Sequence, residues 1–183
     1  MANQHPTNNV GIISSGFHRS SGAYHGAIDF ALPIGKPIYA VESGTVEAHN
    51  EGCPENGYIN NPCGNYGGNW VRIKHSANFK TKSLHLAKVF VKTGEYVKRG
   101  QEIGLSGNSG SSTGPHLHFA VLINDVQVDP SSYINNQKPY PETDISQKKK
   151  CLWVCYLSLL CSFGGFTTTK ESTLIQDWTI SSI

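Results

Sequence analysis

The stretch GNSGSSTGPHLHF, residues 107–119, joins a run of small residues to two histidines one position apart. The apolar segment that follows the pair continues to Ile123 and has the composition of a β-strand. Alternate side chains of a strand share one face, so His116 and His118 point the same way, about 7 Å apart. Two buried imidazoles on one face need polar partners, and an H-x-H pair is therefore a moderate signal for metal binding.

The rest of the sequence predicts an all-β fold. Short segments rich in Val, Ile and Tyr recur between clusters of Gly, Pro, Asn and Ser, and turn sequences such as LPIGKP, ESG, KTGE and KRGQ separate them. We expect strands at residues 38–41, 44–48, 70–75, 83–86, 96–97, 102–105 and 116–123. A β-sandwich or a barrel-like sheet is the natural result. Residues 1 to about 24 are expected to be irregular because Gly and Ser are frequent there.

Length and charge limit the classes of function. The chain has 183 residues and a formal net charge of +2, which suits one domain with a tail. The expected division is a lead-in at residues 1–10, a domain at 11–135, and a polar linker with an apolar, irregular tail at 136–183. The basic residues form no concentrated stripe, so nucleic acid is not an expected partner.

Two of the five cysteines, Cys53 and Cys63, enclose the loop CPENGYINNPC. That loop has few apolar residues to hold it, and a disulfide stabilises such a loop by restricting the unfolded chain. We expect a disulfide here, and hence an oxidising, extracytoplasmic setting, although no secretory signal peptide is visible at the N-terminus. Two reduced loop cysteines are the alternative.

The sequence after residue 135 changes character, ending in the apolar segment CLWVCYLSLLCSFGGF at residues 151–166. This segment is shorter than the roughly 20 residues of a membrane-spanning helix, but Lys148 to Lys150 precede it. Three interpretations remain open, in order of preference. They are an added tail without a stable fold, a short membrane anchor, and a metal site at Cys151, Cys155 and Cys161.

Upstream residues strengthen the metal hypothesis. In HGAIDF, residues 25–30, His25 and Asp29 are four positions apart and add a nitrogen and an oxygen ligand to the histidine pair. Catalytic zinc sites commonly use three such protein ligands and leave a fourth position to water. A further histidine, His85, lies in an expected strand. The remaining histidines are interpreted as structural or surface residues: His5, His18, His49 and His75.

Taken together, five segments resemble the lysostaphin/LytM-type zinc metallopeptidases. These segments are HGAIDF at 25–30, GNWVRIKH at 68–75, LHL at 84–86, the run from Val91 to Phe119, and VDPSSYI at 128–134. The resemblance covers about residues 11–135 in consistent order. It implies a mostly antiparallel β-sheet with an open groove, and hydrolysis of peptide bonds in bacterial peptidoglycan, either in cross-bridges or in stem peptides.

The resemblance also assigns roles. It implies that His25, Asp29 and His118 bind one zinc ion per chain and that His85 and His116 assist the reaction. Because His116 shares a strand face with His118, we expect it to be the general base, with His85 holding the water or stabilising the oxyanion. Which of these two histidines removes the proton stays open.

Substrate contacts are less well defined by the sequence. The family usually has T-x-Y-x-H-L around the first assisting histidine, whereas Ser83 occupies the tyrosine position here. Tyr66 or Tyr24 would then have to supply a hydroxyl at the oxyanion. In the Gly/Ser-rich loop, Asn108 and Ser109 are candidates to bind the backbone of an extended peptide.

Two other functions are compatible with parts of the pattern. A catalytically silent module that activates other wall hydrolases has the same fold, but such modules typically lose the ligand histidines. A histidine phosphocarrier, whose sheets resemble the GTVEA and VKTGEYVKRGQEIG segments, would not need Asp29. We expect a monomer that acts on peptidoglycan peptides and meets a membrane only through residues 151–166.

Overall fold

The computed structural model describes residues 3–143 of the chain. The hypotheses about residues 144–183, including the membrane anchor and the three tail cysteines, therefore lie outside the described residues. Within 3–143, no helix is long and apolar enough to span a bilayer. The boundaries predicted for the lead-in, the domain and the tail remain predictions.

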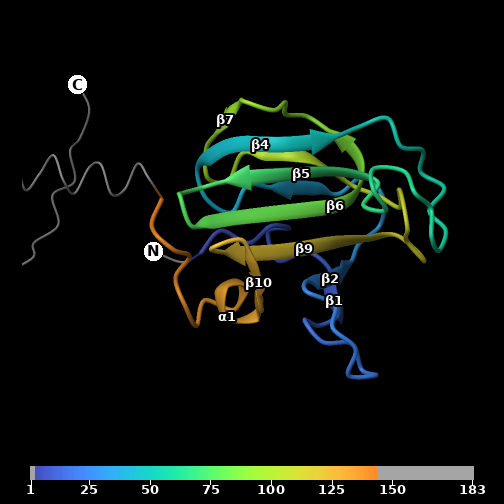
Figure 1. The fold of residues 1–183 in the computed structure, drawn as a ribbon, viewed down its shortest axis with the longest axis horizontal. Coiled ribbons are helices and arrows are strands. Elements are labelled where there is room, and N and C mark those ends of the chain that lie inside the picture. Colours follow the sequence, from blue (N-terminus) through green and yellow to red (C-terminus); the bar gives the residue numbers. More distant parts are fainter. Residues whose placement is uncertain (1–2, 144–183) are drawn as a thin grey trace, which may run out of the picture. The chain divides into compact units, whose positions relative to one another are not determined.

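The strands form an open antiparallel sheet (Figure 1). The elements are β1 (Ile12–Ser15), β2 (Ile28–Ala31), β3 (Pro37–Tyr39), β4 (Gly44–Asn50), β5 (Asn69–Lys74), β6 (Phe79–Val89), β7 (Tyr96–Val97), β8 (Glu102–Ser106), β9 (His116–Ile123), β10 (Val126–Val128) and the short helix α1 (Ser131–Ile134). The main path runs β1-β2-β9-β6-β5-β4-β7, while β8 pairs with β3 and β6, and β10 pairs with β9. The all-β prediction is confirmed.

Each of the seven expected strands overlaps an observed one, and β9 has the predicted bounds. The strand expected at 83–86 is only part of β6, which begins at Phe79 and ends at Val89. The prediction of an irregular segment from residue 1 to about 24 is wrong at β1, which is an edge strand paired with β2. Ile12 of this strand is 74% exposed, so no alternation of buried and exposed residues marks it. Strand β2, strand β10 and helix α1 also went unpredicted; Ile28, Asp29 and Phe30 of β2 are all buried, so no alternation marks that strand either.

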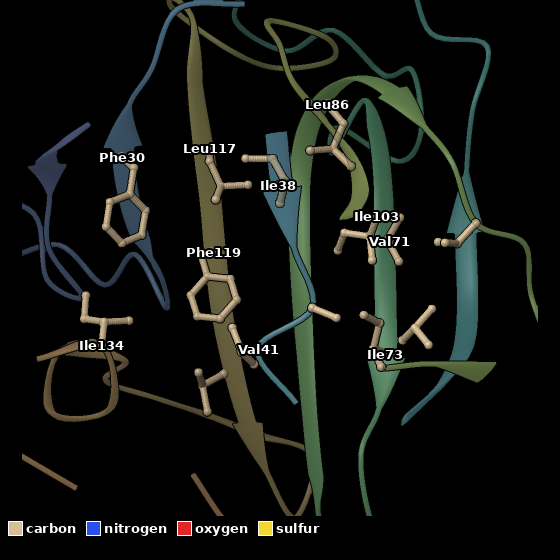
Figure 2. Packing of buried hydrophobic residues seen from close by; sticks show 14 of the residues in the cluster. Phe30, Ile38, Val41, Val71, Ile73, Leu86, Ile103, Leu117, Phe119 and Ile134 are labelled. Carbon is tan, nitrogen blue, oxygen red and sulfur yellow. The ribbon is translucent and has the colours of Figure 1, made fainter. Parts of the chain in front are cut away.

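One apolar cluster holds the sheet together. It draws side chains from most of the strands and from α1, among them Phe30, Ile38, Leu117 and Phe119 (Figure 2). On β9 the buried residues Leu117, Phe119 and Val121 alternate with the half-buried His116 and His118. The predicted alternation therefore directs the two histidines to the face opposite the core.

Strand β6 changes partner in the middle of its length. From Phe79 to Leu84 it pairs with β9, whereas from Leu86 to Val89 it pairs with β8. The pairing with β5 also shifts by one residue in this region, between Val71↔Ser83 and Asn69↔Leu86. His85 lies at the transition with a φ of +62°, which is unusual for a residue with a side chain. A β-bulge at His85 thus ends the contact of β6 with β9.

Candidate active site

Strand pairing brings the predicted metal ligands together. Asp29 on β2 and His118 on β9 are direct partners in the antiparallel register, and Leu84 of β6 is the partner of His118 on the other side. His25 precedes β2 in a loop. The side-chain ligand atoms of His25, Asp29 and His118 all lie within 4.8 Å of one another.

The separations and orientations within this trio suit a single metal ion. His25 Nε2 lies 3.2 Å from Asp29 Oδ2, and His118 Nδ1 lies 3.0 Å from Asp29 Oδ1. Two ligands of a tetrahedral zinc ion are separated by about 3.4 Å, given bond lengths of about 2.1 Å. His25 donates its Nδ1–H to the carbonyl oxygen of Gly16 at 2.9 Å, which leaves Nε2 as the ligand atom. The donor set therefore fits zinc.

The electrostatic state of the trio also suits a metal. Burial raises the pKa of Asp29, but the hydrogen bond from His118 and the charges of His118, His116 and His25 outweigh it, and the pKa lies below its ordinary value. Burial lowers the pKa of His118, against the opposing effect of Asp29. Both shifts favour an ionised carboxylate and a neutral imidazole, which are the forms that bind metal ions.

Gly26, next to His25, permits the approach of the loop to β10. Its φ is +79°, and a Cβ atom there would come 2.5 Å from Gln127 Oε1. A side chain at this position would strain the backbone and displace Gln127. The position of His25 thus depends on a residue without a side chain.

The two further histidines line the same groove. The ring centroids of His85 and His116 are 4.7 Å apart, and His85 lies 5.8 Å from His118. His116 Nε2 is 3.8 Å from Asp29 Oδ1. Four of the five residues predicted for the centre lie on β2, β6 and β9, three adjacent strands, and His25 lies just before β2.

Backbone carbonyl groups orient both of these rings. His116 Nδ1 is 2.8 Å from the carbonyl oxygen of Gly114, and His85 Nδ1 is 2.8 Å from that of Ser109. Since a carbonyl oxygen only accepts, each Nδ1 carries the proton, and the neutral ring presents Nε2 as an acceptor. Burial, followed by the charge of His116, lowers the pKa of His85 to about 4.

The centre lies on the floor of an open groove of about 380 Å³. The groove is lined by the five residues above together with Arg19, Asn65, Tyr66, Gly67, Lys82, Leu84, Ser111, Ser112 and Thr113. A second hollow shares Arg19, Asp29, Thr113 and His116 with it and extends along Ser14 to Gly16. Among the described residues that line the two hollows, Asp29 is the only acidic one, whereas Arg19 and Lys82 are basic.

Of the predicted substrate contacts, only Tyr66 lines the groove, and it is 53% exposed. Ser109 is completely buried, and its hydroxyl donates to the carbonyl oxygen of Leu86 at 2.7 Å. Asn108 is half-buried and donates its backbone N–H to Glu55. The geometry therefore gives no support to substrate contact by Ser109 or Asn108, because neither belongs to the lining of the groove.

The position that differs from the family pattern faces away from the groove. Ser83 is 3% exposed, and its neighbours on β6, Lys82 and Leu84, line the groove. Tyr24 lies outside the lining, and its hydroxyl donates to Gln127 Oε1 at 3.0 Å. Tyr66 is thus the better placed of the two tyrosines considered as hydroxyl donors.

Cys53 and Cys63 are joined by a disulfide beside the groove. The residues just after Cys63, from Asn65 to Gly67, belong to the lining. The histidines interpreted as structural lie outside it. His75 is 3% exposed and stacks on Phe79 with ring centroids 4.5 Å apart.

An open antiparallel sheet with a His/Asp/His centre and two more histidines in one groove defines the class, a β-sheet protein with a metallohydrolase-type site. The model of "Peptidase family M23" matches residues 23–130, which contain all five of these residues. The chain belongs to peptidase family M23. The family implies a metal, typically zinc.

Curated proteins with similar sequences include peptidases, in agreement with the family. The chain is 45% identical over 101 residues to peptidoglycan DD-endopeptidase ShyA of Vibrio cholerae, covering 55% of this chain and 21% of that protein. It is 39% identical over 104 residues to lysostaphin of Staphylococcus simulans, covering 57% of this chain and 19% of that protein. The chain thus spans about a fifth of the length of the curated relatives it matches.

A solved structure supports the fold. A zinc-containing peptidase from Vibrio cholerae superimposes with a TM-score of 0.58 at 39% identity, covering 70% of this chain and 38% of that one. The predictions of fold class and family are confirmed. The roles of the individual residues rest on the geometry and remain proposals.

Proposed function

We propose that this protein is a zinc-dependent endopeptidase that hydrolyses peptide bonds in bacterial peptidoglycan. The observation that carries the proposal is the clustering of three metal-ligand atoms within 4.8 Å, beside His85 and His116. In both of these histidines Nδ1 bonds to a backbone carbonyl oxygen, which leaves Nε2 as an acceptor. A structural metal site would not require the two additional oriented imidazoles. The names of the relatives point to peptidoglycan as the substrate.

His25 Nε2, the Asp29 carboxylate and His118 Nδ1 would hold one zinc ion. When bound, zinc supplies Lewis acidity for the scissile carbonyl and lowers the pKa of water to about 7. Two neutral imidazoles and one carboxylate leave a net charge near +1, since they only partly neutralise a divalent ion. The side chains of His25 and Asp29 are 4% and 11% exposed, so this charge is poorly screened by solvent.

His116 is assigned the general base. Its Nδ1–H is held by the carbonyl oxygen of Gly114, so the lone pair of Nε2 points toward the metal ligands, 3.8 Å from Asp29 Oδ1. A water molecule between the metal ligands and His116 would lie within hydrogen-bond reach of Nε2. The proton taken from that water would pass to the departing amine.

His85 has the same tautomer, enforced by the carbonyl oxygen of Ser109. In its neutral form Nε2 accepts a hydrogen bond and cannot donate one to an oxyanion. We therefore assign His85 to hold the attacking water, and Tyr66 to donate to the oxyanion from the rim of the groove. The backbone of an extended peptide would follow the groove, where Arg19 and Lys82 favour peptides that carry carboxylates.

The setting of the reaction is proposed to lie outside the cytoplasm. The disulfide of Cys53 and Cys63 supports this setting, because disulfides persist in oxidising compartments. The peptidoglycan substrate of the relatives agrees with it.

The test is hydrolysis of purified peptidoglycan by the zinc-loaded chain, with the soluble fragments identified by mass spectrometry. Walls of defined cross-bridge chemistry would reveal which bond is cleaved. His118→Ala is expected to lose both stoichiometric zinc and activity, whereas His116→Ala keeps zinc and loses activity. The matched control is His49→Ala, since His49 bonds to Thr93 and lies outside the groove. Full lytic activity with bound zinc in His118→Ala would refute the proposal, and zinc binding without hydrolysis in the wild type would favour the silent activator.

A further inference from the structure

Asn69, the first residue of β5, is a buried amide that no predicted role explains. It is 2% exposed, and its side chain bonds to both backbone polar groups of Cys53. Oδ1 accepts from Cys53 N at 2.8 Å, and Nδ2 donates to Cys53 O at 2.9 Å. Nδ2 also donates to the carbonyl oxygen of Leu86 at 2.9 Å. One side chain thus connects the disulfide loop to the residue that follows His85.

Ser109 completes the same network from the other side. Its hydroxyl accepts from the backbone N–H of Asn69 at 2.9 Å and donates to the carbonyl oxygen of Leu86 at 2.7 Å. The carbonyl oxygen of Ser109 accepts from His85 Nδ1 at 2.8 Å. The Leu86 carbonyl oxygen therefore accepts from two side chains, those of Asn69 and Ser109. Ser109 also supplies the backbone carbonyl that orients the His85 ring.

The backbone at His85 needs such support. Its φ of +62° lies in the left-handed region, which costs free energy in a residue with a side chain and persists only where surrounding contacts enforce it. The backbone N–H of His85 donates to the carbonyl oxygen of Gly67 at 2.9 Å, which holds one side of the bulge. Asn69 and Ser109 hold the other side through Leu86.

We propose that Asn69 is a positioning residue for His85, and that it acts together with Ser109 through the carbonyl group of Leu86. Its effect on turnover rests on the proposed peptidase function, whereas its effect on the His85 ring does not. The three metal ligands lie on β9, on β2 and before β2, so loss of the Asn69 amide is expected to disturb His85 and to leave metal binding intact.

Two variants test the two halves of the network. Asn69→Ser removes the amide bonds to Cys53 and Leu86. Ser109→Ala removes the hydroxyl bonds to the Leu86 carbonyl oxygen and to the Asn69 N–H while keeping the carbonyl that faces His85. The first readout is the long-range ¹H–¹⁵N spectrum of the histidine rings in chelator-treated protein, with His85→Ala to assign the signals. Wild-type protein is expected to show His85 protonated at Nδ1, and both variants a mixture of tautomers.

The second readout is kinetic. A displacement of about 1 Å at a reacting group lowers a rate by as much as 100-fold, so we expect kcat to fall about 10-fold to 100-fold with KM and zinc content unchanged. In the His85→Ala background, Asn69→Ser should change kcat less than about twofold, because a residue that acts through His85 has nothing further to remove. An additive loss in the double variant would overturn the proposal.

A matched control separates positioning from loss of stability. Thr81 lies on β6, four residues before His85. Thr81→Val removes its buried hydrogen bond with His75 Nε2 (2.8 Å). It should lower the melting temperature without changing kcat or the His85 tautomer. An equal loss of kcat in Thr81→Val and Asn69→Ser, or an unchanged His85 spectrum in Asn69→Ser, would overturn the proposal. If Asn69→Ser does not fold, the His85 spectrum and the kcat of Ser109→Ala test the proposal in the same way. An inactive wild type would refute the proposed function, and the His85 spectrum would still test the positioning role of Asn69.

Discussion

The buried His75 makes the stability of the fold depend on pH. It is 3% exposed, its Nδ1–H donates to the carbonyl oxygen of Ser43 at 3.2 Å, and its Nε2 accepts from the Thr81 hydroxyl at 2.8 Å. Both bonds suit the neutral ring. Burial lowers the pKa of His75 from 6.5 to about 4, against the weaker opposing effect of the Ser43 and Glu42 backbone.

The sign and size follow from this shift. Because the folded pKa lies below the unfolded one, the unfolded chain binds the proton more readily. The contribution of His75 is fully present above pH 6.5 and is lost as the pH falls toward 4. One pKa unit corresponds to about 1.4 kcal/mol, so the loss is about 2 kcal/mol at pH 5 and about 3 kcal/mol at pH 4.

His75→Gln isolates this group, because the amide offers N–H donors and a carbonyl acceptor but does not titrate. Urea unfolding of chelator-treated protein with an intact disulfide, followed by circular dichroism from pH 4 to pH 7.5, measures the free energy of unfolding. The wild type is expected to lose about 2 kcal/mol more than the variant between pH 7.5 and pH 5. Parallel curves for the two proteins would show that His75 titrates alike in both states, and would refute the reasoning.

Three more perturbations test the site and its surroundings. Removal of the metal with a chelator should abolish hydrolysis and lower the melting temperature, and equimolar zinc should restore both, because an ion bound only by the folded state stabilises that state. Calorimetry with and without zinc measures the melting temperature. An unchanged melting temperature would count against a metal site at His25. Replacement of Cys53 and Cys63 by serine opens a loop between residues 10 positions apart and should lower the free energy of unfolding by about 2–3 kcal/mol, as measured by urea unfolding beside the oxidised wild type. Gly26→Ala should weaken zinc binding about 10-fold by titration, because a φ of +79° disfavours a side chain directly beside His25. Gly22→Ala has a similar φ of +81° but is farther along the chain from His25, and equal zinc affinity in the two variants would contradict the argument.

Much of the site was accessible from local pattern. The period of two on β9 predicts that His116 and His118 share a face, and the strand indeed runs from His116 to Ile123 with Leu117 and Phe119 on the buried face. Local pattern did not identify β1, whose Ile12 is exposed. It also suggested Ser109 as a substrate contact, because a serine in a Gly-rich loop has the same local signature whether it faces a groove or supports a bulge.

The amino-acid sequence dictates which side chains alternate between the two faces of a strand and which types of metal ligand are available, since both depend only on neighbouring residues. The choice of ring nitrogen is local at His116, whose Nδ1 bonds to the carbonyl oxygen of Gly114, but at His85 it depends instead on the carbonyl oxygen of Ser109, which belongs to another segment of the chain. The bulge at His85 arises where β6 exchanges β9 for β8, and the Asn69 network exists only once those strands are paired. Pairing between segments tens of residues apart is set by the packing of the whole sheet, so the composition of the centre could be inferred from the sequence while its orientation required the tertiary structure.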